Sequence, residues 1–470
     1  MKMLIGGKWI EGQSSIDVIN PFDGSLVDTV PRGTASDVDK AIESAVKGFA
    51  INRDMPTHKR ISILRRAADL MQERYEDLAI TIASEGSKTI REARKEVGRA
   101  INTMTISAEE ARRLNGETIP FDSAEGSENR VGYYYRFPIG VIAAITPFND
   151  PLNLVAHKLG PAIAGGNAVV LKPATVTPLS ALKLVECLVE AGLPPEILNV
   201  VTGYGSEIGD SLVTDKRIRM VSFTGGVEAG EHIAHKAGLK KIGMELGSNS
   251  PVLVMDDCDL NDAVASCVSG SFWAVGQNCI GVQRLYVQEG IYEEFRKGFL
   301  ELTGKYKTGF QLDEDTDMGP MITEGDAVRV IEWVDEAVQM GATLLAGGTR
   351  KGSLVQPTVM ENMASGAKLD CQEIFGPVVT LYSFKTLDEA IDKANAVDYG
   401  LHGAIFTNDL KQAFTAIKKM DVGGIIVNDS TDYRVDLMPF GGVKNSGLGR
   451  EGIKFSLQEM TEPKVVCFNL

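Results

Sequence analysis

Short apolar runs that end at glycine or proline recur along the chain and alternate with stretches of helical periodicity. The runs have the length of buried strands, and stretches such as residues 178–194 and 387–397 have the periodicity of helices. The strand-like runs are residues 140–148, 167–173, 197–203 and 218–226, followed by residues 250–255, 283–288, 378–384, 404–408 and 423–429. Strands that alternate with helices are typical of parallel sheets with helices on both faces, so we expect an α/β fold.

The two series of runs predict two doubly wound parallel sheets in tandem, because a chain of 470 residues is long for one domain. Helical periodicity also covers residues 35–50 and 58–85, ahead of the first run. Residues 132–138, GYYYRFP, alternate too loosely for a core strand. We expect this segment to form an exposed ribbon, whose aromatic side chains would suit a contact between subunits.

The charge balance and the cysteines exclude several classes of function. A formal net charge of −15 disfavours a nucleic acid or an anionic membrane as the main partner. No apolar run reaches the roughly 18 residues that span a bilayer, and the N-terminus has no apolar signal region. The six cysteines contain no CxxC pair, so neither a disulfide framework nor a zinc site is expected. We therefore expect a protein of the reducing cytoplasm.

Two glycine-rich turns follow strand-like runs and open helices, which is where the pyrophosphate of a dinucleotide would lie. Residues 203–209, GYGSEIG, and residues 223–230, FTGGVEAG, both depart from the GxGxxG spacing. An ordinary strand-to-helix turn explains each of them equally well. His232 and His235 share one helix face without a third ligand, whereas a structural metal site needs four. No metal site is expected.

One cysteine lies in the segment GQNCIGVQ, residues 276–283, with glycines on both sides. A free cysteine inside a soluble protein usually serves only as a small hydrophobic side chain. A thiolate, in contrast, is a strong nucleophile. The residues around Cys279 do not by themselves choose between the two interpretations.

Seven separated motifs occur in order between residues 146 and 451. They are TPFNDP, VVLKPATVTP, SFTGG, MELGSNSP, GQNC, EIFGP and PFGGVKNSGLGRE. With these motifs the chain resembles the aldehyde dehydrogenase superfamily, from IGGKWIEG near the start to the C-terminus. No single motif would suffice, but seven in order are highly specific. The resemblance implies an enzyme that oxidises an aldehyde with a nicotinamide dinucleotide.

The resemblance assigns catalytic roles to three residues. Cys279 corresponds to the nucleophile, which attacks the aldehyde carbon and forms a thiohemiacetal. The side chain of Asn149 and the backbone N–H of Cys279 correspond to the donors that stabilise the oxyanion. Hydride transfer leaves a thioester, and Glu245 corresponds to the base that activates water to hydrolyse it. An unpaired carboxylate in the apolar segment IGMELG would otherwise be costly.

The resemblance also implies a site for NAD or NADP. Lys172 corresponds to the lysine that binds the adenosine ribose, and Glu373 and Phe375 correspond to residues that hold the nicotinamide ribose and ring. The rest of the expected cleft comprises Ile145, Thr146, Pro147, Phe148 and Leu246, with Gly225 and Gly226 beside the pyrophosphate.

Three positions depart from the family pattern. Members that require NAD often have Glu three residues after the lysine, where this chain has Thr175. A carboxylate there would repel a 2′-phosphate, so threonine predicts that NADP is accepted as well as NAD. Gly226 replaces a frequent Ser, and Ser248 replaces a usual Gly for a reason that the sequence does not supply.

The substrate is less constrained than the chemistry. The segments LNLVAHK, ETIP and TDYRVDLMPFGG resemble members that oxidise short hydroxylated or anionic aldehydes, such as lactaldehyde and sulfolactaldehyde. We expect the cations Arg113, His157 and Arg434 near the pocket. A solvated surface charge is an equally good interpretation for Arg113.

Several alternatives stay open. Succinate semialdehyde and aldehydes that carry a phosphate or phosphonate are alternative substrates. Members that use phosphorylated substrates tend to have Arg before the nucleophile, and Asn278 at this position weakens that alternative. A CoA-acylating relative would use the same thiol but generally lacks the base at Glu245. A non-catalytic relative would be expected to have lost Cys279.

The resemblance divides the chain into a cofactor domain, a catalytic domain and a small oligomerisation ribbon. We expect residues 1–115 and 138–247 to form the cofactor domain and residues 248–454 the catalytic domain. Residues 116–137 and 455–470 are expected to form the ribbon. A ribbon of this kind predicts a homodimer or a homotetramer.

Overall fold

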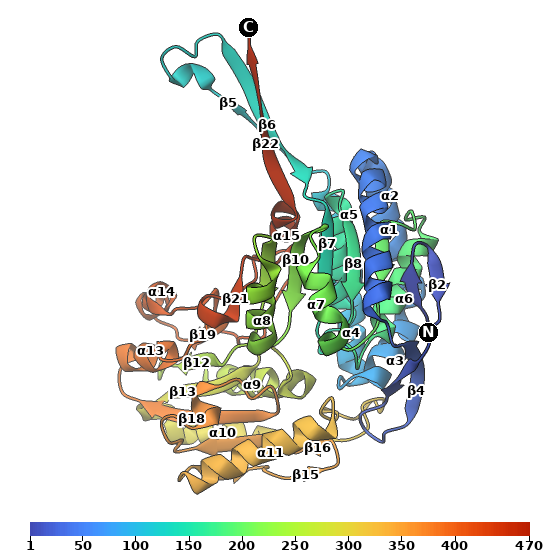
Figure 1. Ribbon diagram of the computed structural model, residues 1–470. Helices are drawn as coiled ribbons and strands as arrows, with labels where there is room; N and C mark the ends of the chain where they lie inside the picture. Colours follow the sequence, from blue (N-terminus) through green and yellow to red (C-terminus); the bar gives the residue numbers. More distant parts are fainter.

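The computed structural model describes residues 1–470 and consists of two α/β units and a projecting β ribbon (Figure 1). One unit is built on an eight-stranded sheet and the other on a seven-stranded sheet. These sheets confirm the α/β class predicted from the sequence. Antiparallel strands lie at the sheet edges, so the sheets are mostly, rather than wholly, parallel.

The eight-stranded sheet has the order β2-β1-β9-β8-β7-β10-β11-β21. Its strands are β1 (Met3–Ile5), β2 (Lys8–Ile10), β7 (Val141–Ile145), β8 (Ala168–Lys172), β9 (Leu198–Val200), β10 (Ile218–Thr224), β11 (Lys241–Glu245) and β21 (Gly447–Leu448). The central strands β7 and β8 are apolar up to Lys172 and parallel, as strands covered on both faces are expected to be. The first four predicted runs correspond to β7, β8, β9 and β10.

The seven-stranded sheet has the order β14-β17-β18-β13-β12-β19-β20. Its strands are β12 (Ser250–Val254), β13 (Val282–Gln288), β14 (Thr343–Ala346), β17 (Thr358–Glu361), β18 (Val378–Phe384), β19 (His402–Phe406) and β20 (Gly424–Val427). The five later runs correspond to β12, β13, β18, β19 and β20. Two hairpins are separate from both sheets, β3 (Ser15–Ile19) with β4 (Leu26–Pro31) and β15 (Arg350–Lys351) with β16 (Leu354–Val355).

Helices surround both sheets (Figure 1). Those of the first unit are α1 (Ala35–Asp54), α2 (Thr57–Glu73), α3 (Tyr75–Glu85), α4 (Ile90–Glu110), α5 (Asn153–Ala164), α6 (Leu179–Glu190), α7 (Gly205–Thr214), α8 (Val227–Ala237) and α15 (Ile453–Glu459). Those of the second unit are α9 (Leu260–Phe272), α10 (Tyr292–Thr303), α11 (Glu324–Gln339), α12 (Lys368–Cys371), α13 (Leu387–Asn395) and α14 (Leu410–Lys419). None of these helices combines the length and the apolar character that a bilayer crossing requires.

The start of α4 is fixed by its sequence. The hydroxyl of Thr89 accepts a hydrogen bond from the N–H of Glu92, and the Glu92 carboxylate accepts one from the N–H of Thr89. This reciprocal cap satisfies donors that the first helical turn leaves free. The helical stretch expected over residues 58–85 is interrupted, because Arg74 leaves helical geometry between α2 and α3.

A three-stranded ribbon projects from the body and carries the C-terminus (Figure 1). Its strands are β5 (Glu117–Ile119), β6 (Arg130–Pro138) and β22 (Thr461–Asn469). Tyr133 and Tyr135 of β6 are 38% and 42% exposed, in agreement with the expected exposed ribbon. The C-terminal strand begins later than residue 455, because α15 precedes it and packs against α4 and α5.

The carboxyl ends of four parallel strands meet at one edge of the first sheet. Ile145 of β7 lies opposite Lys172 of β8 and Phe223 of β10, and Thr224 lies opposite Glu245 of β11. The chain leaves this edge through residues 246–249 and enters β12 of the second unit. Open α/β sheets bind ligands at this edge, so we sought the functional site between the two units.

Candidate active site

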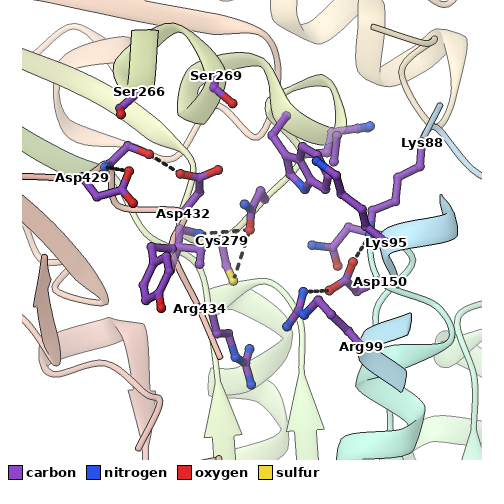
Figure 2. A pocket seen from close by; sticks show the side chains of 18 of the residues that line it. Lys88, Lys95, Arg99, Asp150, Ser266, Ser269, Cys279, Asp429, Asp432 and Arg434 are labelled. Atoms are coloured by element: carbon purple, nitrogen blue, oxygen red, sulfur yellow. Dashed lines mark hydrogen bonds and ion pairs between the residues drawn. The ribbon is translucent and has the colours of Figure 1, made fainter. Parts of the chain in front are cut away.

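A cavity of about 600 Å³ lies where the two units meet (Figure 2). Its walls come from α4, the segment after β7, α9, the turn before β13 and the segment after β20. Cys279 lines this cavity together with Asn149 and Arg434. Three residues that sequence motifs singled out are therefore gathered around one space.

The turn before Cys279 has an unusual backbone and is held from two sides. Ala274 and Gly276 have φ values of 49° and 66°, in the left-handed region that disfavours residues with a side chain. The N–H of Ala274 donates to Oε1 of Glu92 at 2.8 Å, which ties the turn to α4. A Cβ on Gly276 would lie 2.2 Å from the carbonyl oxygen of Gly376, so only glycine fits this close approach.

The thiol of Cys279 is protonated in the free protein at neutral pH. Burial raises the pKa of Cys279 well above its ordinary value, and Glu245 raises it further, whereas Arg434 lowers it. The other five cysteines do not line the cavity, although all six are free thiols. Cys279 therefore requires a nearby proton acceptor before it can act as a nucleophile.

Glu245 is a carboxylate close to this thiol. It is the last residue of β11 and only 2% exposed, and its Oε1 has no hydrogen-bond partner. Burial raises the pKa of Glu245 to about 7, with a further increase from Glu451, while Cys279, Arg434 and Lys158 oppose the shift. A carboxylate with this pKa, next to a thiol, is suited to general-base catalysis at neutral pH.

Glu451 is a second carboxylate at this site, with an opposite pKa shift. The Nζ of Lys158 lies 3.1 Å from its Oε1, and Nη2 of Arg434 lies 3.5 Å from its Oε2. Burial opposes ionisation, but Lys158 and Arg434 outweigh it and lower the pKa of Glu451 to about 2. Glu451 is therefore a fixed anion, and its charge favours the protonated form of Glu245.

Asn149 follows β7 and contributes to the same cavity wall as Cys279. Its neighbour Asp150 pairs with Lys88 and, at 3.3 Å, with Arg99 (Figure 2). These ion pairs fix the backbone of this segment against α4. An amide donor beside the thiol is what an oxyanion on a bound aldehyde would need.

Lys172 and Thr175 lie on the cofactor side of the site. Lys172 is only 6% exposed, has no ion pair, and burial lowers its pKa to about 8. Its Nζ donates to the carbonyl of Pro173 at 3.2 Å. The hydroxyl of Thr175 donates to the carbonyl of Gly203 at 3.0 Å, which joins the turn after β8 to the turn after β9.

The glycines of the SFTGG motif have different surroundings. A Cβ on Gly225 would lie 2.5 Å from the ring of Phe223, so this position has no room for a side chain. Gly226 caps the N-terminus of α8, and a Cβ there would meet no atom within 4 Å. The open space at a helix N-terminus suits a phosphate group. Leu246 closes the other side of α8, where it packs against Gly230.

The segment Ile145, Thr146, Pro147 and Phe148 continues from the end of β7 at the same edge. The N–H of Thr146 donates to the carbonyl of Lys172 at 3.2 Å. Its hydroxyl is buried and has no hydrogen-bond partner. A buried polar atom without a partner is uncommon in proteins, so a ligand at this edge would find an unused donor and acceptor.

Glu373 and Phe375 face this edge from the second unit. The N–H of Ser248 donates to Oε1 of Glu373 at 2.8 Å, and burial raises the pKa of Glu373 to about 8. Phe375 has a φ of 44°, and its ring lies edge-on to Phe148 with centroids 5.7 Å apart. The hydroxyl of Ser248 also forms a hydrogen bond with Ser250 at 3.1 Å, which is a role for a side chain that the sequence left unexplained.

The three cations expected near the pocket have three different positions. Arg434 lines the cavity, as expected. His157 lies behind the wall, bonded to Asp436 at 2.9 Å, and burial lowers its pKa, so it is not the cation that was expected. The expectation for Arg113 is wrong: its side chain is 59% exposed and pairs with Glu110 at 2.6 Å, beyond the end of α4.

One comparison decides the family. The model of the aldehyde dehydrogenase family matches residues 9–466. The chain belongs to the aldehyde dehydrogenase family. The nucleophile, base and amide donor predicted by resemblance thus come together in a structure of this family, and the protein is an aldehyde dehydrogenase.

Relatives of this aldehyde dehydrogenase match it over nearly its full length. Aspartate-semialdehyde dehydrogenase 1 of Pseudomonas canavaninivorans is 52% identical over 97% of this chain and 97% of its own. The 3-sulfolactaldehyde dehydrogenase of Priestia megaterium is 47% identical over 100% of this chain and 98% of its own. The crystal structure of the NADP-dependent glyceraldehyde-3-phosphate dehydrogenase of Bacillus halodurans, complexed with NADP, has a TM-score of 0.97 and 39% identity, covering 100% of this chain and 99% of its own.

The sequence analysis missed most of the charged residues that surround Cys279 in this aldehyde dehydrogenase. Lys95 and Arg99 of α4 line the cavity on one side, and Asp429 and Asp432 line it on the other (Figure 2). Lys95 and Arg99 are four residues apart, which places both on one helix face. That spacing was available in the sequence, but it does not tell which face of α4 meets the cavity.

Proposed function

We propose that this aldehyde dehydrogenase oxidises a short aldehyde that carries an anionic group to the corresponding acid. The observation that carries the proposal is Arg434, whose side chain lines the cavity with Cys279 and is only 6% exposed. Its Nε has no hydrogen-bond partner, and its ion pair with Glu451 is long, at 3.5 Å. A buried guanidinium with spare donors favours a substrate with a carboxylate or sulfonate.

The names of two relatives support this substrate class. Aspartate semialdehyde and 3-sulfolactaldehyde, after which they are named, are both short aldehydes with an acidic group. Succinate semialdehyde, which the sequence left as an alternative, belongs to the same class. Lactaldehyde lacks the acidic group, so we expect it to be a weaker substrate.

The residues at the site define the proposed order of proton transfers. The thiol of Cys279 gives its proton to Glu245, and its sulfur attacks the aldehyde carbon. The amide of Asn149 and the N–H of Cys279 donate to the oxyanion of the thiohemiacetal. NAD or NADP, when bound, would accept the hydride by which a thioester is formed. Glu245 releases the proton of the thiol to solvent and takes a proton from the water that attacks the thioester. It then returns this proton to the departing sulfur of Cys279, so that the acid and the free thiol are released.

The residues at the carboxyl edge of the first sheet fit NAD or NADP. Gly226 leaves open space at the N-terminus of α8, and the buried hydroxyl of Thr146 has no partner. Lys172, Glu373 and Phe375 would hold the two riboses and the nicotinamide ring. No carboxylate pairs with Lys172, so nothing there repels a 2′-phosphate. The relative solved with NADP supports our proposal that both dinucleotides support turnover.

Open sheet edges support an oligomer. β20 is the last strand of the seven-stranded sheet, and β22 is an edge strand of the ribbon. Val465 and Phe468 of β22 are 60% and 50% exposed. Edge strands with exposed apolar side chains favour pairing with another chain. We propose a homodimer or homotetramer in the reducing cytoplasm, and sedimentation that finds only monomer at micromolar concentration would contradict the oligomer.

The substrate class is tested by comparing succinate semialdehyde with butanal, using NAD and NADP in parallel. The two aldehydes have similar length, but only the first carries a charge. Arg434→Ala is expected to lower kcat/KM for both aldehydes, because Arg434 also lowers the pKa of Cys279 and of Glu245. The loss for succinate semialdehyde should exceed the loss for butanal by about 30-fold or more, as loss of a buried charge partner does. Arg113→Ala removes an arginine outside the cavity and serves as the control. If Arg434→Ala lowers kcat/KM equally for the two aldehydes, Arg434 does not bind an anionic group of the substrate and the proposed substrate class is wrong.

A further inference from the structure

The wall of the catalytic cavity that faces α4 carries two carboxylates, Asp429 and Asp432, to which the chemistry above gives no role (Figure 2). Both follow β20, are half-buried, and form no ion pair with a lysine or arginine. The N–H of Ser430 donates to Oδ1 of Asp429 at 2.8 Å, and its hydroxyl donates to Oδ1 of Asp432. Ser430 therefore orients both carboxylates, and the Oδ2 of each has no partner in the protein.

Cations lie on the opposite side of the same cavity. Lys88 and Arg99 are compensated, because both pair with Asp150, Lys88 also pairs with Glu96, and Arg99 also pairs with Asp436. Lys95 has no ion pair and lies over the ring of Trp273, 4.7 Å from its centroid. The cavity thus has uncompensated positive charge on the α4 side and uncompensated negative charge after β20, with Cys279 between them (Figure 2).

Two buried donors in the cavity wall lack acceptors, which separately indicates that the cavity binds a ligand. Gln277 is 1% exposed, and its Oε1 accepts from the N–H of Ile322 at 3.0 Å, so its Nε2 is left without a partner. The Nε of Arg434 is also buried without a partner. Buried donors are rarely left in this state, so the occupant of the cavity should bring acceptor oxygens as well as a positive charge.

We propose that the substrate is zwitterionic: an α-amino acid whose side chain ends in the aldehyde. Arg434 binds its carboxylate, and Asp432, together with Asp429, binds its ammonium group. Asp432 and Arg434 are two residues apart and both line the cavity, so one ligand in that space would face an anion and a cation. This inference rests on the proposed function, since it adds an ammonium group to the anionic aldehyde already argued.

The electrostatics of Asp432 agree with a cationic group at this place. Burial raises the pKa of Asp432, and Asp429 raises it as well, while Ser430 and Lys95 lower it. An ammonium ion between the two carboxylates would remove their mutual repulsion and supply three donors for their unused oxygens. The relative with 52% identity is named for aspartate semialdehyde, which is an aldehyde of this class.

The test compares aspartate semialdehyde with succinate semialdehyde, which differ only by the ammonium group. For the wild type we expect kcat/KM to be about tenfold or more higher for aspartate semialdehyde, the value of one partly buried ion pair. Asp432→Asn is expected to abolish that preference by lowering kcat/KM for aspartate semialdehyde alone. Asp432→Glu, which keeps the charge, should retain part of the preference. Asp421→Asn changes an exposed aspartate and is the matched control.

The outcomes separate this inference from the proposed function. The zwitterion proposal is overturned if succinate semialdehyde is the better substrate, or if Asp432→Asn lowers kcat/KM equally for the two substrates. In either case the proposal of an anionic substrate still stands. If the wild type oxidises neither acid faster than butanal, the proposed function fails as well. Oxidation of succinate semialdehyde by Asp432→Asn shows that the variant is folded, and Asp429→Asn provides a second, independent variant with the same expected direction.

Discussion

Glu245 is buried and Glu451 beside it is only 15% exposed, yet the pKa of Glu245 is raised to about 7 and that of Glu451 is lowered to about 2. The surroundings of Glu451 include Lys158 and Arg434 within ion-pair distance. Those of Glu245 include a thiol and no cation within that distance, and one carboxylate oxygen has no partner. Burial and the neighbouring anion Glu451 raise the pKa of Glu245, whereas two cations lower that of Glu451 despite burial. The high pKa of Glu245, the base that we propose, therefore depends on the absence of a paired cation.

The largest expected effect comes from removing the uncompensated carboxylate. Glu245→Gln keeps the size of the side chain but removes the proton acceptor, so steady-state turnover should fall about 10²–10⁴-fold, the range of general-base contributions. Hydride transfer should survive in part. We therefore expect a burst of reduced cofactor near one per active site, followed by a slow phase, with an acyl adduct on Cys279 in the intact mass.

Two variants control this experiment. Cys279→Ser should abolish the burst and the adduct together, and Glu301→Gln, on the exposed face of α10, should change neither. Normal turnover of Glu245→Gln would show that Glu245 is not the base that activates water. Either another group activates it, or the acyl group is transferred to CoA, the alternative left open by the sequence. Loss of the burst with cofactor binding intact would instead show that Glu245 acts mainly on the thiol.

The second prediction is that the two carboxylates contribute to stability with opposite signs at pH 8. The native state holds the Glu245 proton more tightly than the unfolded state, so its stability contribution declines as pH rises from 4.5 to about 7. Glu245→Gln should therefore raise the free energy of unfolding at pH 8 by on the order of 1–3 kcal/mol. The contribution of Glu451 is present above pH 4.5 and is lost as pH falls towards 2. Glu451→Gln should lower stability by about 3 kcal/mol, because it leaves two buried cations without their partner.

Urea unfolding of both variants at pH 8, followed by fluorescence, measures these changes. When urea unfolding is repeated at pH 5, the gain in the free energy of unfolding caused by Glu245→Gln should be smaller, because the wild-type side chain is then mostly protonated. If both variants change the free energy of unfolding in the same direction at pH 8, the two carboxylates do not contribute to stability with opposite signs.

The third prediction concerns a carboxylate introduced beside a buried lysine at the proposed cofactor site, as Glu451 lies beside Lys158. Thr175→Glu places a carboxylate near Lys172, whose pKa is lowered to about 8 by burial. The new charge should raise the pKa of Lys172 and repel a 2′-phosphate, which shifts the kcat/KM ratio about tenfold from NADP towards NAD. Thr175→Gln has the same shape without the charge and should leave the ratio near that of the wild type. A wild type that is inert with NADP at millimolar concentration would contradict the argument.

The smallest expected effect is on the pH profile. Hydrolysis requires ionised Glu245, so its rate should rise with pH through about 7. Because the charge of Glu451 raises the pKa of Glu245, Glu451→Gln should move the midpoint to lower pH, which corresponds to about a threefold gain in relative rate at pH 6. Turnover measured from pH 5.5 to 8.5 tests this, and an unchanged midpoint would show that the two carboxylates are not coupled.

The sequence predicted features that depend on short segments. The period and length of the apolar runs predicted the central strands, and short motifs that resemble those of a known family predicted Cys279, Glu245 and Lys172. Glu245 and Lys172 each end a strand, and Cys279 lies in the turn before β13. The edge strand β14 and its neighbour β17 were not among the predicted runs. The break at Arg74 was missed because it interrupts apolar periodicity without a glycine or proline.

The residues that line the substrate cavity were harder to predict, because they come from several elements. Arg113 and Lys95 are both cations of the α4 region, but only Lys95 lines the cavity. Their difference comes from how α4 packs, which no local pattern reports. His157 has the same difficulty: burial and Arg434 lower its pKa, although Asp436 raises it, and no local pattern reports these neighbours.

The contact between Gly276 and Gly376 links the loop that carries the nucleophile to the loop that carries Glu373 and Phe375. In protein engineering the two loops should therefore be exchanged together, because a chimera that mixes them from different parents would set the thiol at the wrong depth relative to the cofactor cleft. The segment 429–434 lies outside this pair, which makes it the better starting point for a library that seeks new substrates.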